Sequence, residues 1–325
     1  MRDVYGRTID YLRISVTDRC NYRCVYCMPP EGVTALAHAD VLTYEEIVRL
    51  VDVASRLCGI SRVRLTGGEP LVRTGIVDLV AQIAALPGIR DLAMTTNGSL
   101  FVLLAESLKR AGLKRVNISL DTLDPERYRV VTGGGSVEPV LAAIEQAVAL
   151  DFQPVKINAV LTAALQRDDV EQLYRMVMRL PVVVRFIEYM PIGRQAVAPG
   201  LSIAEVKNLL VQLGGELTET ASLVGGGPAR NYRLAGAAGA VGFITPLSEH
   251  FCAACNRLRL TADGRLKPCL LSELEINVRE VLRSGADDAA LAAVLTEAAG
   301  RKPPGHTLTA GYHDGFQRQM PQIGG

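Results

Sequence analysis

The chain carries the stretch Tyr-Leu-Arg-Ile-Ser-Val-Thr-Asp-Arg-Cys-Asn-Tyr-Arg-Cys-Val-Tyr-Cys at residues 11–27. Residues 11–16 have the composition of a short β-strand, and three cysteines follow at Cys20, Cys24 and Cys27. Sites in α/β folds are built at the carboxyl ends of parallel strands. We therefore expect this stretch to be the first strand of such a fold and its cysteines to belong to a site.

The combination of a short β-rich run and an amphipathic helical run recurs along the first part of the chain. We predict strands at residues 11–16, 62–66, 91–96, 115–120, 155–161 and 182–189. The first helix is predicted to begin with a capping box of Thr43 and Glu46, and others follow at about residues 75–85, 100–111 and 137–150. This alternation predicts a parallel sheet with helical crossovers, either doubly wound and open or a barrel two units short of complete.

The pattern changes after about residue 215. Glycine-rich segments at residues 225–227 and 236–242 lie beside β-like pieces around Tyr232, Phe243 and Leu258. We expect helices at residues 274–283 and 287–299, then a mobile tail that contains Pro303 and Pro304. These features divide the chain into residues 1–215 and a second region, residues 216–325.

The composition is that of a folded, nearly neutral protein. Of its 325 residues 49% are hydrophobic, and the net charge is +1. A disordered or fibrous chain is excluded, and no overall field is available to hold nucleic acid or an anionic membrane, so any anion site must be a local cluster. Neither a secretory signal nor an apolar run of membrane-spanning length is evident. We expect a soluble, cytoplasmic protein without nucleic-acid or membrane partners.

Six of the seven cysteines fall into two groups, and Cys58 lies on the apolar stripe of a helix as a buried small residue. Clustered thiols in a reducing compartment bind metal or do redox chemistry more often than they form disulfides. The first group has the spacing C-x3-C-x2-C, which suits three irons of a 4Fe-4S cluster and leaves the fourth iron open. A zinc site is the weaker alternative because structural zinc takes four ligands.

The second group consists of Cys252, Cys255 and Cys269. We favour a second 4Fe-4S cluster with one free iron that could hold the substrate. The alternative is a zinc site completed by His250, Asp263 or a remote histidine. Between these cysteines, Arg257 and Arg259 share one face of a predicted strand, and their planar guanidinium groups suit phosphate or purine. No phosphate-binding G-x-x-x-x-G-K-[ST] loop is present, so the phosphates would be held and not hydrolysed.

The first cysteine group, with Tyr26 before its last cysteine and Gly-Gly-Glu-Pro at residues 67–70, resembles the radical S-adenosylmethionine superfamily. Within it, the chain resembles the GTP 3′,8-cyclases, the molybdenum cofactor biosynthesis protein A family, essentially from end to end. The matching segments are residues 10–29, 64–70, 95–98, 117–122, 156–158, 185–193, 251–264 and 324–325. Residues 164–171 follow the family pattern only loosely, and the glycine loop at 133–135 is generic.

The resemblance implies an α/β fold, an incomplete (β/α)6 TIM-type barrel whose open side is covered by a C-terminal α+β region. It implies that a 5′-deoxyadenosyl radical takes the C3′ hydrogen of GTP, and that C3′ then attacks C8 to give (8S)-3′,8-cyclo-7,8-dihydroguanosine 5′-triphosphate. This reaction is the first step of molybdenum cofactor biosynthesis.

The resemblance also assigns roles to residues. Two 4Fe-4S clusters would be held by Cys20, Cys24 and Cys27 and by Cys252, Cys255 and Cys269. The S-adenosylmethionine contacts would be Tyr26, Gly68, Ser119 and Met190. The GTP contacts would be Arg13, Arg64, Thr95, Lys156, Arg257, Leu258 and Arg259. The catalytic residues would be Arg257, Arg259, Gly324 and Gly325, the two glycines reaching back into the site.

An external one-electron donor of the flavodoxin kind and cyclic pyranopterin monophosphate synthase are the expected functional partners, and both a monomer and a homodimer remain open. The main rival is a radical S-adenosylmethionine enzyme that modifies peptides and carries an auxiliary cluster. Such enzymes generally need more auxiliary cysteines than three. A non-catalytic iron-sulfur or zinc sensor of nucleic acid is opposed by the balanced charge.

Overall fold

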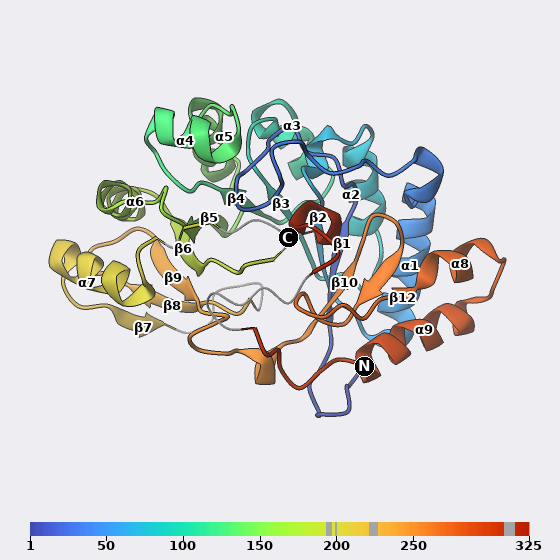
Figure 1. Cartoon of the computed structure of the whole chain (residues 1–325). Helices are drawn as coiled ribbons and strands as arrows, with labels where there is room; N and C mark the ends of the chain where they lie inside the picture. The colour runs from blue at the N-terminus through green and yellow to red at the C-terminus, as the bar shows by residue number, and fades with distance from the viewer. Residues whose placement is uncertain (193–196, 199, 221–226, 309–315, 325) are drawn as a thin grey trace.

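The computed structural model describes residues 1–192, 197–198, 200–220, 227–308 and 316–324. Gly225, Gly226 and Gly325, which carry some of the expectations above, lie outside the described residues. Within the described part, six strand-and-helix units curve around one side of the molecule (Figure 1).

Six neighbouring strands form the parallel part of the sheet, each paired with the next along the chain. They are β1 (Tyr11–Ser15), β2 (Arg62–Thr66), β3 (Asp91–Thr96), β4 (Arg115–Ser119), β5 (Val155–Leu161) and β6 (Val182–Glu188). The six predicted strands are therefore confirmed, three with identical bounds and three one residue shorter at the carboxyl end.

Strands of the C-terminal region continue this sheet at both edges. One arm begins with β10 (Arg257–Leu260), parallel to β1, followed by β11 (Arg265–Lys267) and β12 (Ile276–Asn277). The other arm begins with β9 (Ala240–Ile244), parallel to β6, followed by β8 (Arg230–Arg233) and β7 (Thr218–Thr220). The resulting sheet has 12 strands and, in the described residues, ends at β12 and β7 without closing. The expectation of an incomplete barrel flanked by a C-terminal α+β region is confirmed.

Helices pack outside the six parallel strands (Figure 1). They are α1 (Tyr44–Cys58), α2 (Ile76–Ala84), α3 (Phe101–Arg110), α4 (Pro125–Thr132), α5 (Glu138–Ala149), α6 (Arg167–Arg179) and α7 (Ile203–Gly214). The capping box of Thr43 and Glu46 is present. Sequence reasoning missed α4, α6 and α7. No helix of the described residues has the length and apolarity needed to cross a membrane.

Strand alternation separates an apolar outer face from a polar inner face. On β2, Val63 and Leu65 pack in the core under the helices, while Arg64 faces the barrel interior beside the cavity described below. Cys58 is buried in the same core, as expected for a structural cysteine. The barrel thus buries its apolar residues outward and presents polar side chains inward.

The C-terminal helices are α8 (Val278–Arg283), α9 (Asp288–Gly300) and α10 (Met320–Ile323). The helix expected at residues 274–283 is wrong in its first turn. Residues Ile276 and Asn277 pair with β11, and the Asn277 side chain then caps α8 by accepting a hydrogen bond from the Glu280 amide. The strand pairing and this cap fix the helix start at Val278.

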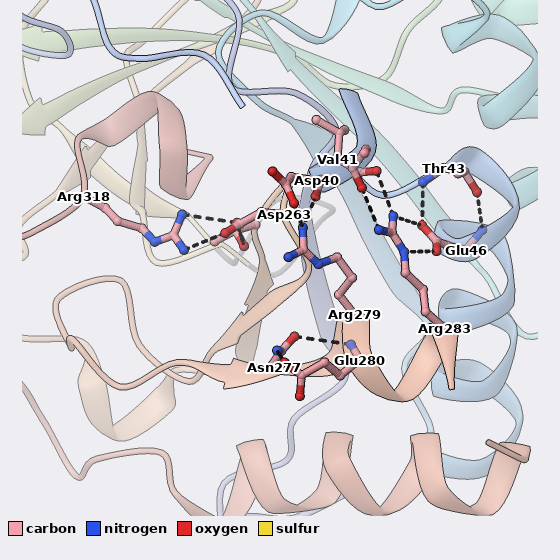
Figure 2. Close-up of polar contacts among 12 residues, drawn as sticks. Asp40, Val41, Thr43, Glu46, Asp263, Asn277, Arg279, Glu280, Arg283 and Arg318 are labelled. Carbon is pink, nitrogen blue, oxygen red and sulfur yellow. Dashed lines mark hydrogen bonds and ion pairs between the residues drawn. The ribbon is translucent and has the colours of Figure 1, made fainter. Parts of the chain in front are cut away.

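Two arginines on α8 join the C-terminal region to the N-terminal half (Figure 2). Arg279 donates to the carbonyl and carboxylate of Asp40, at 2.6 and 3.0 Å. Arg283 donates to Glu46 of the α1 capping box and to the Val41 carbonyl. These side chains tie α8 to the segment that leads into α1.

The tail is packed wherever it is described, which corrects the expectation of a mobile end. Phe316 and Ile323 are buried together with Ile192 and Leu308. Arg318 donates to both carboxylate oxygens of Asp263, at 3.2 and 2.8 Å (Figure 2). An apolar cluster and a bidentate ion pair therefore hold residues 316–324 against the barrel.

Candidate active site

A cavity of about 300 Å³ lies at the carboxyl ends of the strands, between the two groups of cysteines. Most of the predicted site residues line it: Arg13, Cys20, Cys24, Tyr26, Cys27, Arg64, Gly68, Thr95, Ser119, Met190, Cys252, Cys255, Arg257, Arg259 and Cys269. Leu258 does not line the cavity, because it lies on the opposite face of β10 and is fully buried in the core. Lys156 lies deeper on β5, on the same face as Asn158 of the lining.

The first cysteine group follows β1 and is supported by the loop at residues 67–70. A Cβ on Gly68 would lie 2.3 Å from the Arg19 carbonyl oxygen, and one on Gly67 would lie 2.6 Å from that of Thr17. Glycine is therefore required here for the two backbones to approach each other, in addition to any contact with a ligand.

The thiols of this group favour a cationic partner. None of them is in a disulfide. Burial, with the charges of Cys27 and Asp121, raises the pKa of Cys24 well above its usual value, and burial with Cys20 raises the pKa of Cys27 to about 12. Three adjacent thiolates are costly in this setting unless a positive centre compensates them. The donor set therefore fits an iron-sulfur cluster, whose irons take deprotonated cysteines.

Asp121 fixes Tyr26 beside this group. The Tyr26 hydroxyl donates to Asp121 Oδ2 at 2.6 Å, and the Val160 amide donates to Asp121 Oδ1 at 2.8 Å. Burial raises the pKa of Asp121 to about 6. Since Tyr26 lies between Cys24 and Cys27, Asp121 positions the ring that faces the cavity.

The second cysteine group lies in a cationic setting. Cys252 begins the short helix η3 (Cys252–Ala254), Cys255 follows it, and Cys269 follows β11. Although burial alone would raise it, Arg257 and Lys302 bring the pKa of Cys255 down to about 6. Its thiolate is therefore stabilised before any metal binds, which fits a cluster ligand.

Arg7 clamps this part of the site from the N-terminus. Its guanidinium donates to the carbonyls of Cys252 at 2.9 Å, Pro303 at 2.7 Å and Pro304 at 3.2 Å. The same side chain is paired with the buried Asp3. One planar group thus holds the cysteine segment and the segment after α9 in a fixed relation.

Basic side chains crowd the cavity wall and the barrel interior below it. Burial, with Arg259 and Arg64, lowers the pKa of Arg13 well below its usual value; burial lowers that of Arg185 to about 9. Burial and Arg185 lower the pKa of Lys156 to about 6. Such mutual repulsion is relieved by a bound polyanion. The interior is therefore suited to a triphosphate.

The tail enters the same site. The Gly324 carbonyl accepts a hydrogen bond of 3.2 Å from Arg259 Nη1. Gly324 has a left-handed φ of 75°, and a Cβ there would lie 2.9 Å from both Ser15 Cβ and Thr66 Cγ2. Figure 1 shows α10 next to β1 and β2. Gly324 is therefore in place beside Arg259, one of the two predicted catalytic arginines.

Comparison with known proteins identifies the family. Residues 14–177 match the Radical SAM superfamily, and residues 182–308 match Molybdenum Cofactor Synthesis C. The chain is 49% identical to the GTP 3′,8-cyclase of Heliobacterium modesticaldum and 48% identical to that of Pelotomaculum thermopropionicum, and 100% of each chain is covered. This chain belongs to the GTP 3′,8-cyclase family.

The superfamily brings a 4Fe-4S cluster and S-adenosylmethionine, and the first cysteine group lines the cavity. Among solved structures, Streptococcus suis SuiB bound to S-adenosylmethionine superposes with a TM-score of 0.62 at 17% identity, covering 90% of this chain and 68% of that one. At this identity the likeness concerns the fold alone, and it confirms the barrel architecture.

Several site residues of this family member were missed from the sequence. Arg185 and Asn158 line the cavity, and Arg185 donates to the Asn158 side chain. Arg185 on β6, like Arg64 on β2, is a basic residue between apolar neighbours on a strand. The period-two pattern of a strand could therefore have predicted that Arg185 faces the barrel interior. Lys302 and Arg7 had no comparable signal, because their partners are far away in the sequence.

Proposed function

We propose that this chain converts GTP into (8S)-3′,8-cyclo-7,8-dihydroguanosine 5′-triphosphate, the first step of molybdenum cofactor biosynthesis. The observation that carries the proposal is the pair of three-cysteine groups lining one cavity whose floor is basic. The first group suits the radical chemistry of the superfamily, and the second group with the basic floor suits a nucleoside triphosphate.

The first group and its neighbours would bind S-adenosylmethionine. When bound and reduced by one electron, S-adenosylmethionine would supply a 5′-deoxyadenosyl radical, which would remove the C3′ hydrogen of GTP. The lining residues proposed to contact it are Tyr26, Gly68, Ser119 and Met190, with Cys20, Cys24 and Cys27 as cluster ligands. Asp121 would keep Tyr26 in place for this contact.

The second group and the basic interior would bind GTP. We propose that Cys252, Cys255 and Cys269 would hold a second 4Fe-4S cluster with one free iron, which would bind the substrate. The groups proposed for ribose and phosphates are Arg13, Arg64, Thr95, Lys156, Arg185, Arg257 and Arg259. Leu258 would act indirectly, because its core packing makes both neighbouring arginines face inward. Gly324 and Gly325 would complete the site from the tail.

Further parts of the proposal concern the setting of the reaction. Residues 1–215 would form the S-adenosylmethionine-binding part and residues 216–325 the auxiliary-cluster region. An external one-electron donor of the flavodoxin kind would reduce the site, and cyclic pyranopterin monophosphate synthase would take the product. We propose a cytoplasmic location because six clustered thiols need a reducing compartment.

The test is anaerobic turnover of reconstituted protein with S-adenosylmethionine, a reductant and GTP deuterated at C3′. We expect deuterium in the 5′-deoxyadenosine, detected by mass spectrometry. Cys24→Ser should abolish cleavage of S-adenosylmethionine, whereas Cys255→Ser should keep some uncoupled cleavage and lose the cyclised product. Absence of label transfer in protein that carries both clusters would contradict the choice of GTP as substrate. Full product formation by either variant would contradict the two-cluster assignment.

A further inference from the structure

Two histidines lie directly beside Cys252. One ligand atom each from His250, Cys252 and His306 can be chosen so that all three lie within 4.8 Å of one another. The two imidazole rings are stacked, with centroids 4.4 Å apart and an angle of 26° between their planes. Among the residues that the structure describes, this is the one group of three potential ligands that meets such a distance limit.

The donor set is that of a single borderline metal ion. One thiolate and two imidazoles are typical zinc ligands, at about 2.3 and 2.0–2.1 Å from the metal, which places tetrahedral ligand atoms about 3.5 Å apart. Small side-chain rotations would bring atoms within 4.8 Å to that spacing. Three protein ligands would leave the fourth position open. The exposed side of His250 offers an entry path for the ion.

Two separate segments carry these ligands, and Arg7 of the N-terminal segment holds the two together. Arg7 donates to the carbonyl of Cys252 and to those of Pro303 and Pro304, which immediately precede Gly305 and His306. A Cβ on Gly305 would lie 3.8 Å from Cys252 Sγ, so the segment before His306 runs against the thiol. The clamp therefore holds the backbone that leads to His306 beside Cys252.

One ring nitrogen of His306 points independently to a ligand. Its Nδ1 is buried and has no hydrogen-bond partner. A buried polar atom without a hydrogen-bond partner is unfavourable, and such a lone pair is what a metal ion would satisfy. The ring also lines the main cavity, next to the second cysteine group.

We propose that His250, Cys252 and His306 bind one divalent transition-metal ion of the zinc class while the second cluster is absent. The inference rests on the proposed function in one respect, since Cys252 is also a proposed ligand of that cluster. The ion and the cluster therefore exclude each other. Ion binding needs only loss of the Cys252 thiol proton and no oxidant or reductant.

Cobalt(II) is the probe, added anaerobically to iron-free full-length chain in which Cys20, Cys24, Cys27, Cys255 and Cys269 are replaced by alanine. We expect one tetrahedral Co²⁺ per chain with charge transfer from a single thiolate. His306→Ala in this background should weaken Co²⁺ binding more than about tenfold, because even outer-shell partners of metal ligands are worth that much. His38→Ala is the matched control, an exposed histidine on η1 (His38–Asp40) that should change nothing.

Unchanged Co²⁺ affinity in His306→Ala, or no Co²⁺ binding by a five-alanine chain that circular dichroism shows to be folded, would overturn the proposal. If that chain does not fold, zinc absorption spectroscopy on the iron-free natural sequence decides. One sulfur and two nitrogen neighbours would support the proposal, whereas three sulfurs would refute it.

A separate measurement keeps this proposal apart from the two-cluster proposal. Iron is counted after reconstitution of the natural sequence with and without prior Zn²⁺. We expect Zn²⁺ to prevent uptake of one cluster's iron, and His306→Ala to relieve that block. Uptake of a single cluster without any Zn²⁺ would refute the second cluster while leaving the Co²⁺ result intact. Equal iron uptake with and without Zn²⁺ would refute competition at Cys252.

Discussion

Gly324→Ala probes whether the docked tail takes part in the reaction. The substitution places a Cβ 2.9 Å from both Ser15 Cβ and Thr66 Cγ2, in a residue whose φ is 75°. At this position the Gly324 carbonyl accepts a hydrogen bond from the Arg259 guanidinium. The change therefore acts on the tail at the point where it meets a predicted catalytic arginine.

The penalty can be estimated from the two causes. A left-handed conformation costs a residue with a Cβ about 1–2 kcal/mol, and overpacking costs about 1–3 kcal/mol. Together they give about 2–5 kcal/mol against the docked tail. Burial of Phe316 and Ile323 contributes about 1.5–3 kcal/mol each toward docking, so the penalty is comparable to the gain. The penalty removes most of this gain, so we expect the undocked tail to become populated and turnover to fall below that of the natural sequence.

The assay combines product formation from GTP, iron content and hydrogen exchange of residues 316–324. Iron content and the thermal midpoint should stay near those of the natural sequence, while the tail exchanges faster. Gly285→Ala is the matched control, since Gly285 also has a positive φ of 77° but no heavy atom within 4 Å of the position that a Cβ would take. It should lose only about 1–2 kcal/mol of stability and keep normal turnover. Turnover of Gly324→Ala within twofold of normal would refute the role given to the tail.

Three further changes follow from the site. Because burial and Arg185 lower the pKa of Lys156 to about 6, its amine is largely neutral above that pH, and a bound triphosphate should raise this pKa again. GTP binding at pH 7–8 should therefore take up a proton, and the affinity for GTP should fall as pH rises. Calorimetry in buffers of different ionisation enthalpy measures this proton uptake, which should be absent in Lys156→Met. The lysine of Arg7→Lys cannot bridge the same carbonyls. The reconstituted variant should therefore lose the iron held by the second cysteine group but still cleave S-adenosylmethionine. Full iron content in the variant would count against the role of Arg7 as a clamp. Asp121→Ala removes one charged hydrogen bond to the Tyr26 hydroxyl, which is worth about 1.5–3 kcal/mol, so S-adenosylmethionine binding should weaken about tenfold. Equilibrium binding measures this change, and the iron content should stay unchanged. An unchanged Kd would argue against the support of Tyr26 by Asp121.

The barrel was predictable because its signals are local. The predicted strands are short β-prone runs separated by helical patterns, and apolar residues alternate with polar ones in residues 62–66 and in the first part of 155–161. The capping box at Thr43 is equally local, since both partners lie within four residues. The cysteine spacing likewise fixes a donor set before any fold is known.

The remaining features depend on contacts between distant segments. Arg7 meets Cys252 across 245 positions and Pro303 across 296, and no local pattern marks it as different from any other N-terminal arginine. Tail docking also depends on distant segments, because the partners of Arg318 are Asp263, in the turn after β10, and Glu275. The start of α8 could not be placed because an edge-strand pair with β11 overrides the helical pattern of residues 274–277.

The interior charge links the fold to its ligand. Net charge +1 shows no excess of basic residues in the whole chain, yet Arg13, Arg64, Lys156 and Arg185 are gathered inside the barrel, where burial lowers the pKa of each. A folded chain that holds these groups close together is less stable than one in which their charges are matched. A polyanion that binds only the folded state stabilises that state by mass action and so offsets the loss of stability. If the proposed function holds, a bound triphosphate would relieve this repulsion, and the position of each basic residue on an inward strand face would direct the phosphates to one place.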